Sequence, residues 1–155
     1  MNVVASKRSG SKATSVPSVQ REESLDELCK RANFLVVAAP ATESTRGQID
    51  ERRLALLPPG AIVCVISRGG IVDEEALADA IESGRLGGAS VDSTAVEPLP
   101  PASRLWTLPS VLLTPHSSAL SSELFERRRV IFEQQLARFL RGEPLQNTID
   151  MVAAF

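Results

Sequence analysis

Three segments of this sequence carry side chains that are suited to catalysis. His116 is the only histidine among the 155 residues, and it follows a Thr-Pro step. Arg68 follows the apolar run AIVCVI, and Glu97 comes shortly after a second run, which ends at Asp92. An imidazole can donate or accept a proton near neutral pH, and a guanidinium binds a planar carboxylate through two parallel hydrogen bonds. An arginine, two carboxylates and an imidazole together are typical of an active site.

Each of these residues lies at or just beyond the end of an apolar run of strand length. Continuous apolar runs, in place of alternating ones, predict strands that are covered on both faces. The polar stretch Ser6–Gln20 predicts a loop with a short extended piece near Val16. The runs that predict strands are Val3–Ala5, FLVVAAP (34–40), AIVCVI (61–66), GGASVD (87–92) and SVLLT (110–114).

Helical patterns separate these runs. Ser24 and the glutamate three residues later form a capping box that opens a short helix. Asp50 caps a helix through Leu57, Asp73 caps the helix EEALADAIESG, and Ser121 begins a long helix with a mostly apolar stripe. Strands that alternate with helices predict an α/β fold, with a parallel sheet and helices on both faces. Ligands of such sheets bind at the edge where the strands have their carboxyl ends.

Composition narrows the classes of function. The chain is 43% hydrophobic and 23% charged with a net charge of −2, as expected for one globular domain with no field that attracts nucleic acid. No apolar run approaches the ~18 residues of a membrane span, and the N-terminus lacks the order of a signal peptide, so we expect a cytoplasmic protein. Cys29 and Cys64 stand in no metal-binding spacing, which predicts two buried thiols and no metal site.

Several motifs resemble those of a known family. SRGGIVDEEAL, VDSTAVEPLP and LLTPHSSA, in this order and at these intervals, are similar to the D-isomer-specific 2-hydroxyacid dehydrogenases. AAPATESTRGQI, RLWTLPSVLLTPH and FLRGEPLQNTID extend the similarity, which covers about Ser24 to Asp150 and more loosely reaches Met1. The resemblance implies a Rossmann-type sheet and an NAD(P)-dependent oxidoreductase. Its substrate would be a small 2-keto or 2-hydroxy acid, such as glyoxylate or hydroxypyruvate.

The resemblance also implies a role for each candidate catalytic residue. Arg68 would hold the substrate carboxylate and keto oxygen, His116 would be the acid and base, and Glu97 would be its carboxylate partner. The roles agree with the chemistry, because hydride transfer to a keto carbon requires a proton for the developing alkoxide. A carboxylate beside an imidazole orients the ring and favours its protonated form.

The family binds a nicotinamide dinucleotide, either NAD or NADP. By the resemblance, Ala39, Pro40 and Thr45 flank the adenosine ribose and the pyrophosphate. Lys7 and Arg8 follow the first strand, where a basic residue accommodates the 2′-phosphate, so we favour NADP. The other residues implied in cofactor binding are Ile66 and Ser67 beside the nicotinamide ribose, Asp92 at the carboxamide, and Ser117 and Ser118 with His116 behind the ring.

One departure from the family affects the whole sheet. The fingerprint GxGxxG occurs nowhere in the sequence, and in the family it follows the first Rossmann strand. In the usual strand order 3-2-1-4-5-6 this strand is central. We therefore expect residues 1–155 to form a partial NAD(P)-binding domain, without the first strand, its helix or a substrate domain. Such a chain would be inactive or weak by itself.

Other interpretations remain open. The chain could be a non-catalytic dinucleotide-binding or interaction module, or an inactive remnant. Full-length relatives dimerise through the cofactor domain, so a homodimer is possible. Glu74, in Asp73-Glu74-Glu75, is most simply a first-turn acid that favours the helix dipole. Gly69 and Gly70 are either a tight strand-to-helix turn or small residues that let the backbone approach a cofactor.

Overall fold

The chain folds into two compact units, Met1–Pro115 and His116–Phe155. The structure is a computed structural model that describes residues 2–6, 19–21 and 24–148. Every described strand belongs to the first unit, and the second contains one long helix. Among the described residues, no helix combines the length and apolar character needed to span a membrane.

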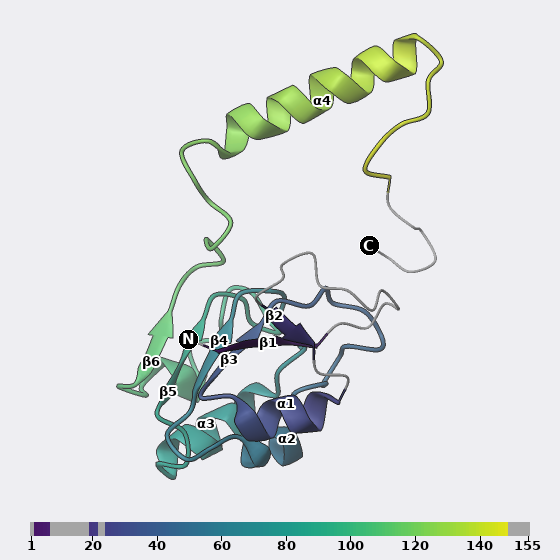
Figure 1. Cartoon of the computed structure of the whole chain (residues 1–155). Coiled ribbons are helices and arrows are strands. Elements are labelled where there is room, and N and C mark those ends of the chain that lie inside the picture. Colours follow the sequence, from purple (N-terminus) through teal and green to yellow (C-terminus); the bar gives the residue numbers. More distant parts are fainter. Residues whose placement is uncertain (1, 7–18, 22–23, 149–155) are drawn as a thin grey trace. The chain divides into compact units, whose positions relative to one another are not determined.

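A four-stranded parallel sheet forms the centre of the first unit (Figure 1). Its order follows the sequence, β3-β4-β5-β6, and each neighbouring pair is parallel. The carboxyl ends of the strands therefore share one edge. This arrangement confirms the predicted parallel α/β sheet. The strands are β3 (Phe34–Val37), β4 (Ile62–Val65), β5 (Gly88–Val91) and β6 (Val111–Leu113).

A separate two-stranded parallel sheet consists of β1 (Val3–Ala5) and β2 (Val19–Arg21). β1 was predicted. β2 overlaps the end of the stretch Ser6–Gln20, which was predicted to be a loop with a short extended piece near Val16, a residue outside those described. Its sequence Val-Gln-Arg contains no apolar run, so local pattern does not reveal it. Among the described residues the two sheets are not joined by strand pairing.

Three short helices follow their predicted caps. α1 (Leu25–Arg31) begins after Ser24, whose side chain accepts a hydrogen bond from the backbone N–H of Glu27. Asp50 caps α2 (Glu51–Leu56) through the N–H of Arg53. Asp73 caps α3 (Glu74–Glu82) by accepting from two backbone N–H groups of the first turn. Each cap satisfies N–H groups that have no partner within the helix.

Helices α1, α2 and α3 gather on one side of the four-stranded sheet (Figure 1). Leu35 and Val37 of β3 and Val63 and Val65 of β4 are buried on that side. Leu54 of α2 and Leu77 of α3 are also almost fully buried in the same core. The covered face therefore follows every second residue of each strand, as the pleat requires.

The other face of this sheet, called the open face below, carries the alternate residues. Strand register aligns Val36, Cys64, Ser90 and Leu112 in one row across it. Val36 is 55% exposed and Leu112 62% exposed, and Cys64 is only half-buried. The expected cover on both faces and the expected burial of Cys64 thus differ from the structure of this unit. An apolar run places side chains on both faces, but α1–α3 cover only one.

The second unit contains α4 (Leu124–Leu140). It begins later than the predicted start at Ser121, and its N-cap residue Glu123 makes no side-chain cap hydrogen bond. Instead, the Ser121 carbonyl accepts a backbone hydrogen bond from Leu124 in the preceding turn. None of the helix residues is buried. Ion pairs between neighbouring turns, such as Glu126 with Arg129, lie along its surface.

Candidate active site

The residues after β4 form the first part of the site. Ile66 is 45% exposed, whereas Ser67 is buried. The Ser67 hydroxyl has no hydrogen-bond partner among the described residues. Arg68 is exposed, and its Nη1 donates to the Ser67 carbonyl at 2.8 Å. The strand end thus presents an apolar side chain and a cationic one next to each other.

The residues after β5 and β6 are joined by a side-chain hydrogen bond. Asp92 is 4% exposed, and its Oδ1 accepts from the Thr114 hydroxyl at 2.5 Å. The Thr114 backbone N–H also donates to the Val91 carbonyl at 3.1 Å. Thr114 was not among the predicted site residues, although its place directly before Pro115-His116 was a signal. The structure therefore ties the segment that leads to His116 to the buried carboxylate of Asp92.

The loop that carries Glu97 is held by two carboxylates. Oε1 of Glu97 accepts from the backbone N–H of Thr94 at 3.1 Å. The next N–H along the chain, that of Ala95, donates to Oε1 of Glu74 at 2.5 Å. Burial raises the pKa of Glu74, and the hydrogen bond from Ala95 opposes this effect. Glu74 was predicted only as a first-turn acid of α3, and its contact with this loop was missed.

Gly69 brings the loop after β4 against the loop after β5. A Cβ atom added to Gly69 would lie 1.9 Å from the Thr94 carbonyl oxygen and 2.4 Å from the Ala95 nitrogen. Gly70 has a φ of +79°, a left-handed conformation that favours glycine. The left-handed conformation of Gly70 agrees with the predicted tight turn. At Gly69 the close approach is to backbone of this chain.

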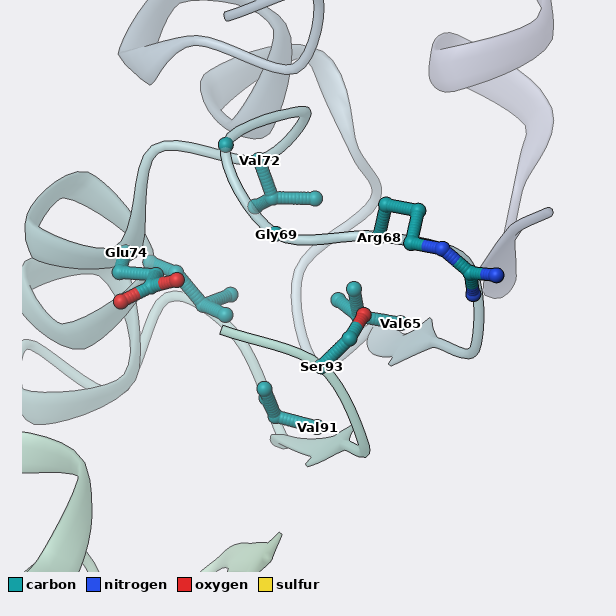
Figure 2. A pocket seen from close by; sticks show the side chains of 9 residues that line it. Val65, Arg68, Gly69, Val72, Glu74, Val91 and Ser93 are labelled. Atoms are coloured by element: carbon teal, nitrogen blue, oxygen red, sulfur yellow. The ribbon is translucent and has the colours of Figure 1, made fainter. Parts of the chain in front are cut away.

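A small pocket opens between these two loops and the start of α3 (Figure 2). It has about 210 Å³ of empty space, part of it open to solvent. Gly69 lies between Glu74 and Arg68 in this view, and the Arg68 guanidinium points away from Glu74. Ser93 lies opposite Gly69, and its buried hydroxyl has no partner among the described residues. The pocket is therefore lined by the loop that contains Arg68, by Glu74 at the start of α3 and by Ser93 after β5.

The loop after β3 is closed by Thr45, which is 6% exposed. The Thr45 hydroxyl donates to the Pro40 carbonyl at 2.7 Å and accepts from the Thr42 N–H at 2.8 Å. Pro40 is exposed and Ala39 is half-buried. Thr45 therefore shapes the loop through its hydroxyl, and Pro40 and Ala39 form the accessible part.

The remaining predicted residues lie in the second unit or outside the described residues. His116 is exposed and has a φ of +50°, which is uncommon for a residue with a side chain. Ser117 is half-buried and Ser118 is exposed. Lys7 and Arg8 lie outside the described residues. No group of three His, Cys, Asp or Glu side chains within the described part of the chain could hold a metal ion.

The structure thus brings together four of the residues considered. Arg68 follows β4, Asp92 follows β5, and Thr114 follows β6, all at the carboxyl edge of neighbouring parallel strands. Glu97 is in the loop that leaves the same edge. At this edge the exposed Arg68 guanidinium is the group that can pair with a small anionic substrate.

Comparison with known proteins identifies similar sequences over most of this chain. Residues 1–118 match the family model of the D-isomer specific 2-hydroxyacid dehydrogenase NAD binding domain. D-3-phosphoglycerate dehydrogenase of Methanocaldococcus jannaschii is 36% identical over 86% of this chain and 25% of its own length. Glyoxylate reductase of Pyrococcus furiosus is 37% identical over 77% of this chain and 35% of its own length. The aligned part is therefore a quarter to about a third of these relatives.

Solved structures share the fold. A D-isomer specific 2-hydroxyacid dehydrogenase from Xanthobacter autotrophicus, in complex with NADPH and MES, matches with a TM-score of 0.89 and 32% identity. The match covers 99% of this chain and 63% of that one. An NADPH-dependent glyoxylate/hydroxypyruvate reductase from Sinorhizobium meliloti, in complex with NADP and sulfate, matches with a TM-score of 0.87 and 35% identity. That match covers 99% of this chain and 49% of the other.

Proposed function

This chain belongs to the D-isomer-specific 2-hydroxyacid dehydrogenase family, and we propose that it supplies the cofactor-binding and catalytic part of a 2-keto acid reductase. The substrate is a small 2-keto acid such as glyoxylate or hydroxypyruvate, and the product is the D-2-hydroxy acid. The observation that carries the proposal is the shared carboxyl edge of the parallel strands. Arg68 follows β4 at this edge, and Asp92 and Glu97 follow β5. The next strand, β6, leads to His116.

In this proposal Arg68 binds the substrate. Its guanidinium is exposed beyond β4 and carries five N–H donors in a fixed fork. A guanidinium pairs with the planar carboxylate of a 2-keto acid and polarises the neighbouring keto oxygen. Two-point binding also fixes which face of the ketone is presented to the hydride donor. Arg68 thus both holds and orients the keto acid.

His116 supplies the proton. When hydride reaches the keto carbon, the oxygen becomes an alkoxide and takes the proton of the imidazolium. Glu97 acts through His116 by stabilising the protonated ring and orienting it. In the reverse direction the neutral imidazole removes the proton from the hydroxyl group. Asp92 is a buried carboxylate at the same edge, and its hydrogen bond with Thr114 joins the ends of β5 and β6.

The edge has features that suit the nicotinamide part of a dinucleotide, which supplies the hydride when bound. Ile66 offers an apolar surface for the ring, and the family resemblance assigns Asp92 to the carboxamide. Ala39 and Pro40 follow the neighbouring strand β3, and we assign them to the ribose and pyrophosphate part of the dinucleotide. The sequence has no GxGxxG turn, so the pyrophosphate cradle is not part of this fit. Lys7 and Arg8 favour NADP over NAD as the cofactor.

A kinetic comparison tests the proposal. We expect oxidation of NADPH that depends on glyoxylate or hydroxypyruvate and that is lost in both Arg68→Ala and His116→Ala. A chimera in which residues 1–118 replace the matching segment of the Pyrococcus furiosus glyoxylate reductase provides a second assay if the chain alone turns over slowly. Full activity of both variants in either active protein would contradict the assigned roles. NADPH binding without any turnover would instead favour a non-catalytic dinucleotide-binding module.

The proposal extends to compartment and partners. Cys29 and Cys64 are both free thiols, which is typical of the reducing cytoplasm. We propose a cytoplasmic protein whose partners are the dinucleotide and the 2-keto acid, with neither nucleic acid nor a membrane as a partner. The open face and the apolar residues of α4 are surfaces through which a homodimer could form, and sedimentation of the intact chain would reveal its mass.

A further inference from the structure

We propose that Glu74 is a positioning residue that sets the distance between the loops carrying Arg68 and Glu97. This inference rests on the proposed function, because it concerns the same two side chains. Glu74 itself need not touch the substrate. It lies at the start of α3, and its carboxylate reaches the loop after β5 at Ala95.

The first step of the argument is the bond between Glu74 and Ala95. The two atoms, Glu74 Oε1 and Ala95 N, are 2.5 Å apart and join residues that are 21 positions apart in the sequence. A carboxylate binds an N–H group more strongly than a neutral acceptor does. Glu74 is half-buried, so this bond is partly shielded from water. It anchors the peptide between Thr94 and Ala95 to a helix of the core.

The second step is the contact on the opposite side of that peptide. The same Thr94–Ala95 peptide lies against Gly69, so closely that no side chain fits there. Gly69 directly follows Arg68. The peptide is therefore held between Gly69 and the Glu74 carboxylate, and a loss of the Glu74 bond allows it to move away from the Arg68 loop.

The third step links this peptide to Glu97. Oε1 of Glu97 accepts from the N–H of Thr94, at 3.1 Å, one position before the N–H that Glu74 binds. The Thr94 hydroxyl also donates to the Val96 carbonyl at 2.9 Å, which tightens the loop. A shift of the Thr94–Ala95 peptide consequently changes the position of the Glu97 carboxylate as well. A displacement of about 1 Å in such a site can cost on the order of 100-fold in rate.

Two substitutions at Glu74 and one neighbouring control test the proposal. Glu74→Gln keeps an oxygen that accepts the Ala95 N–H, whereas Glu74→Ala removes it. Glu75→Ala removes a charge of the same sign from the same helical turn. Glu75 contacts Arg104 at 3.3 Å, and Arg104 lies later in the connection between β5 and β6 than the Thr94–Ala95 peptide. The control therefore separates the loss of the loop contact from the loss of an acidic charge.

The first measurement is amide hydrogen exchange of Thr94 and Ala95 in the full chain. We expect exchange of Ala95 to become about tenfold faster in Glu74→Ala, to stay near wild type in Glu74→Gln, and to be unchanged in Glu75→Ala. Exchange within twofold of wild type in Glu74→Ala would overturn the proposal. So would a Glu74→Gln protein that exchanges as fast as Glu74→Ala. This readout does not depend on any activity.

The second measurement is steady-state kinetics with glyoxylate and NADPH. In Glu74→Ala we expect KM for glyoxylate to rise and kcat to fall, with kcat/KM lowered about tenfold or more, and substantial recovery in Glu74→Gln. A purely structural role would reduce the fraction of active protein and lower kcat without changing KM. If Arg68→Ala is inactive but Glu74→Ala is unchanged, only the positioning role fails. If Arg68→Ala is fully active, the proposed function fails.

Discussion

The Thr114 hydroxyl donates to Oδ1 of Asp92 at 2.5 Å, which joins the carboxyl ends of β5 and β6. Asp92 is 4% exposed, and the Thr114 hydroxyl gives its buried carboxylate a hydrogen bond. The bond lies two residues before His116. The bond therefore connects the buried Asp92 to the segment that carries His116, the proposed acid and base.

Removal of this bond should destabilise the chain. We expect Thr114→Val, which keeps the shape of the side chain, to lower the free energy of unfolding by about 1–3 kcal/mol, because Asp92 loses a hydrogen bond while it stays buried. Urea unfolding at neutral pH measures the change. Thr107→Val is the control, since its hydroxyl bonds an exposed carbonyl of Arg104. Equal stability of the Thr114 and Thr107 variants would argue against a structural role of the Thr114 bond.

Replacement of Arg68 by lysine should impair the enzyme despite the conserved charge. We expect kcat/KM for the keto acid to fall on the order of 100-fold, because an ammonium cannot form the two-pronged contact that orients the substrate. Initial rates at several glyoxylate concentrations measure the effect. Arg128→Ala on α4 is the matched control and should retain the wild-type rate. A fully active Arg68→Lys enzyme would show that two-point binding is not needed.

The ion pairs of Asp26 should make stability depend on pH. Asp26 accepts two hydrogen bonds from Arg52, at 2.7 and 3.0 Å, and one from Arg53, at 2.8 Å. Arg52 first and Arg53 second hold the pKa of Asp26 well below its usual range. A lowered pKa means that the stabilisation is complete above the unfolded value of about 3.9 and is lost as the pH falls through the folded value.

We therefore expect Asp26→Asn to have a lower Tm than wild type at pH 7, with a difference that narrows as the pH is lowered below about 4. Thermal unfolding from pH 7 down to pH 2 measures this difference. Glu43→Gln, which changes an exposed carboxylate of a loop, should leave it near zero throughout. A difference that is constant over the whole range would contradict the linkage.

The two cysteines should differ in reactivity. Burial raises the pKa of the Cys29 thiol, which is fully buried, whereas Cys64 is half-buried on the open face. We expect a disulfide reagent such as Ellman's reagent to modify one thiol rapidly in the native chain, and Cys64→Ser to abolish that phase. Cys29→Ser should leave it intact. Slow modification of both thiols in the native chain would indicate that the open face is covered in solution.

Cofactor choice should depend on the basic residues after β1. We expect Lys7→Glu with Arg8→Glu to weaken NADPH binding by about tenfold or more, because a charge-assisted contact with the 2′-phosphate is lost. Binding of NADH should change much less. Fluorescence titration of both dinucleotides measures the two affinities, and Lys30→Ala is a control for loss of positive charge. An equal loss of affinity for both cofactors would contradict recognition of the 2′-phosphate.

Much of the local structure follows directly from the sequence. Ser24, Asp50 and Asp73 cap α1, α2 and α3 as predicted, since a cap depends only on residues within one helical turn. The strands β3 to β6 lie within the apolar runs that predicted them, because an apolar run is also a local feature of the sequence. Ser121 was wrong as a helix start because a serine marks a cap only when the next residues become helical, and here Glu123 occupies that position.

The parallel sheet was predicted from the alternation of strands and helices, whereas the order of the strands was implied by the family resemblance. Because parallel strands share their carboxyl edge, the predicted sheet was sufficient to place Arg68 and Asp92, which follow β4 and β5, at one edge. The short strand β2 was not within reach. Its residues are mostly polar, and its conformation depends on pairing with β1 across a long connection.

The sequence by itself therefore determined which residues stand at the strand ends, because local pattern and chain order fix that edge. Only the tertiary structure decided which of them touch. The bond from Ala95 to Glu74, the approach of Gly69 to Thr94 and the uncovered face of the sheet join or separate residues far apart in the chain. Such contacts depend on how loops and layers pack in three dimensions, and no periodicity along the sequence records that packing.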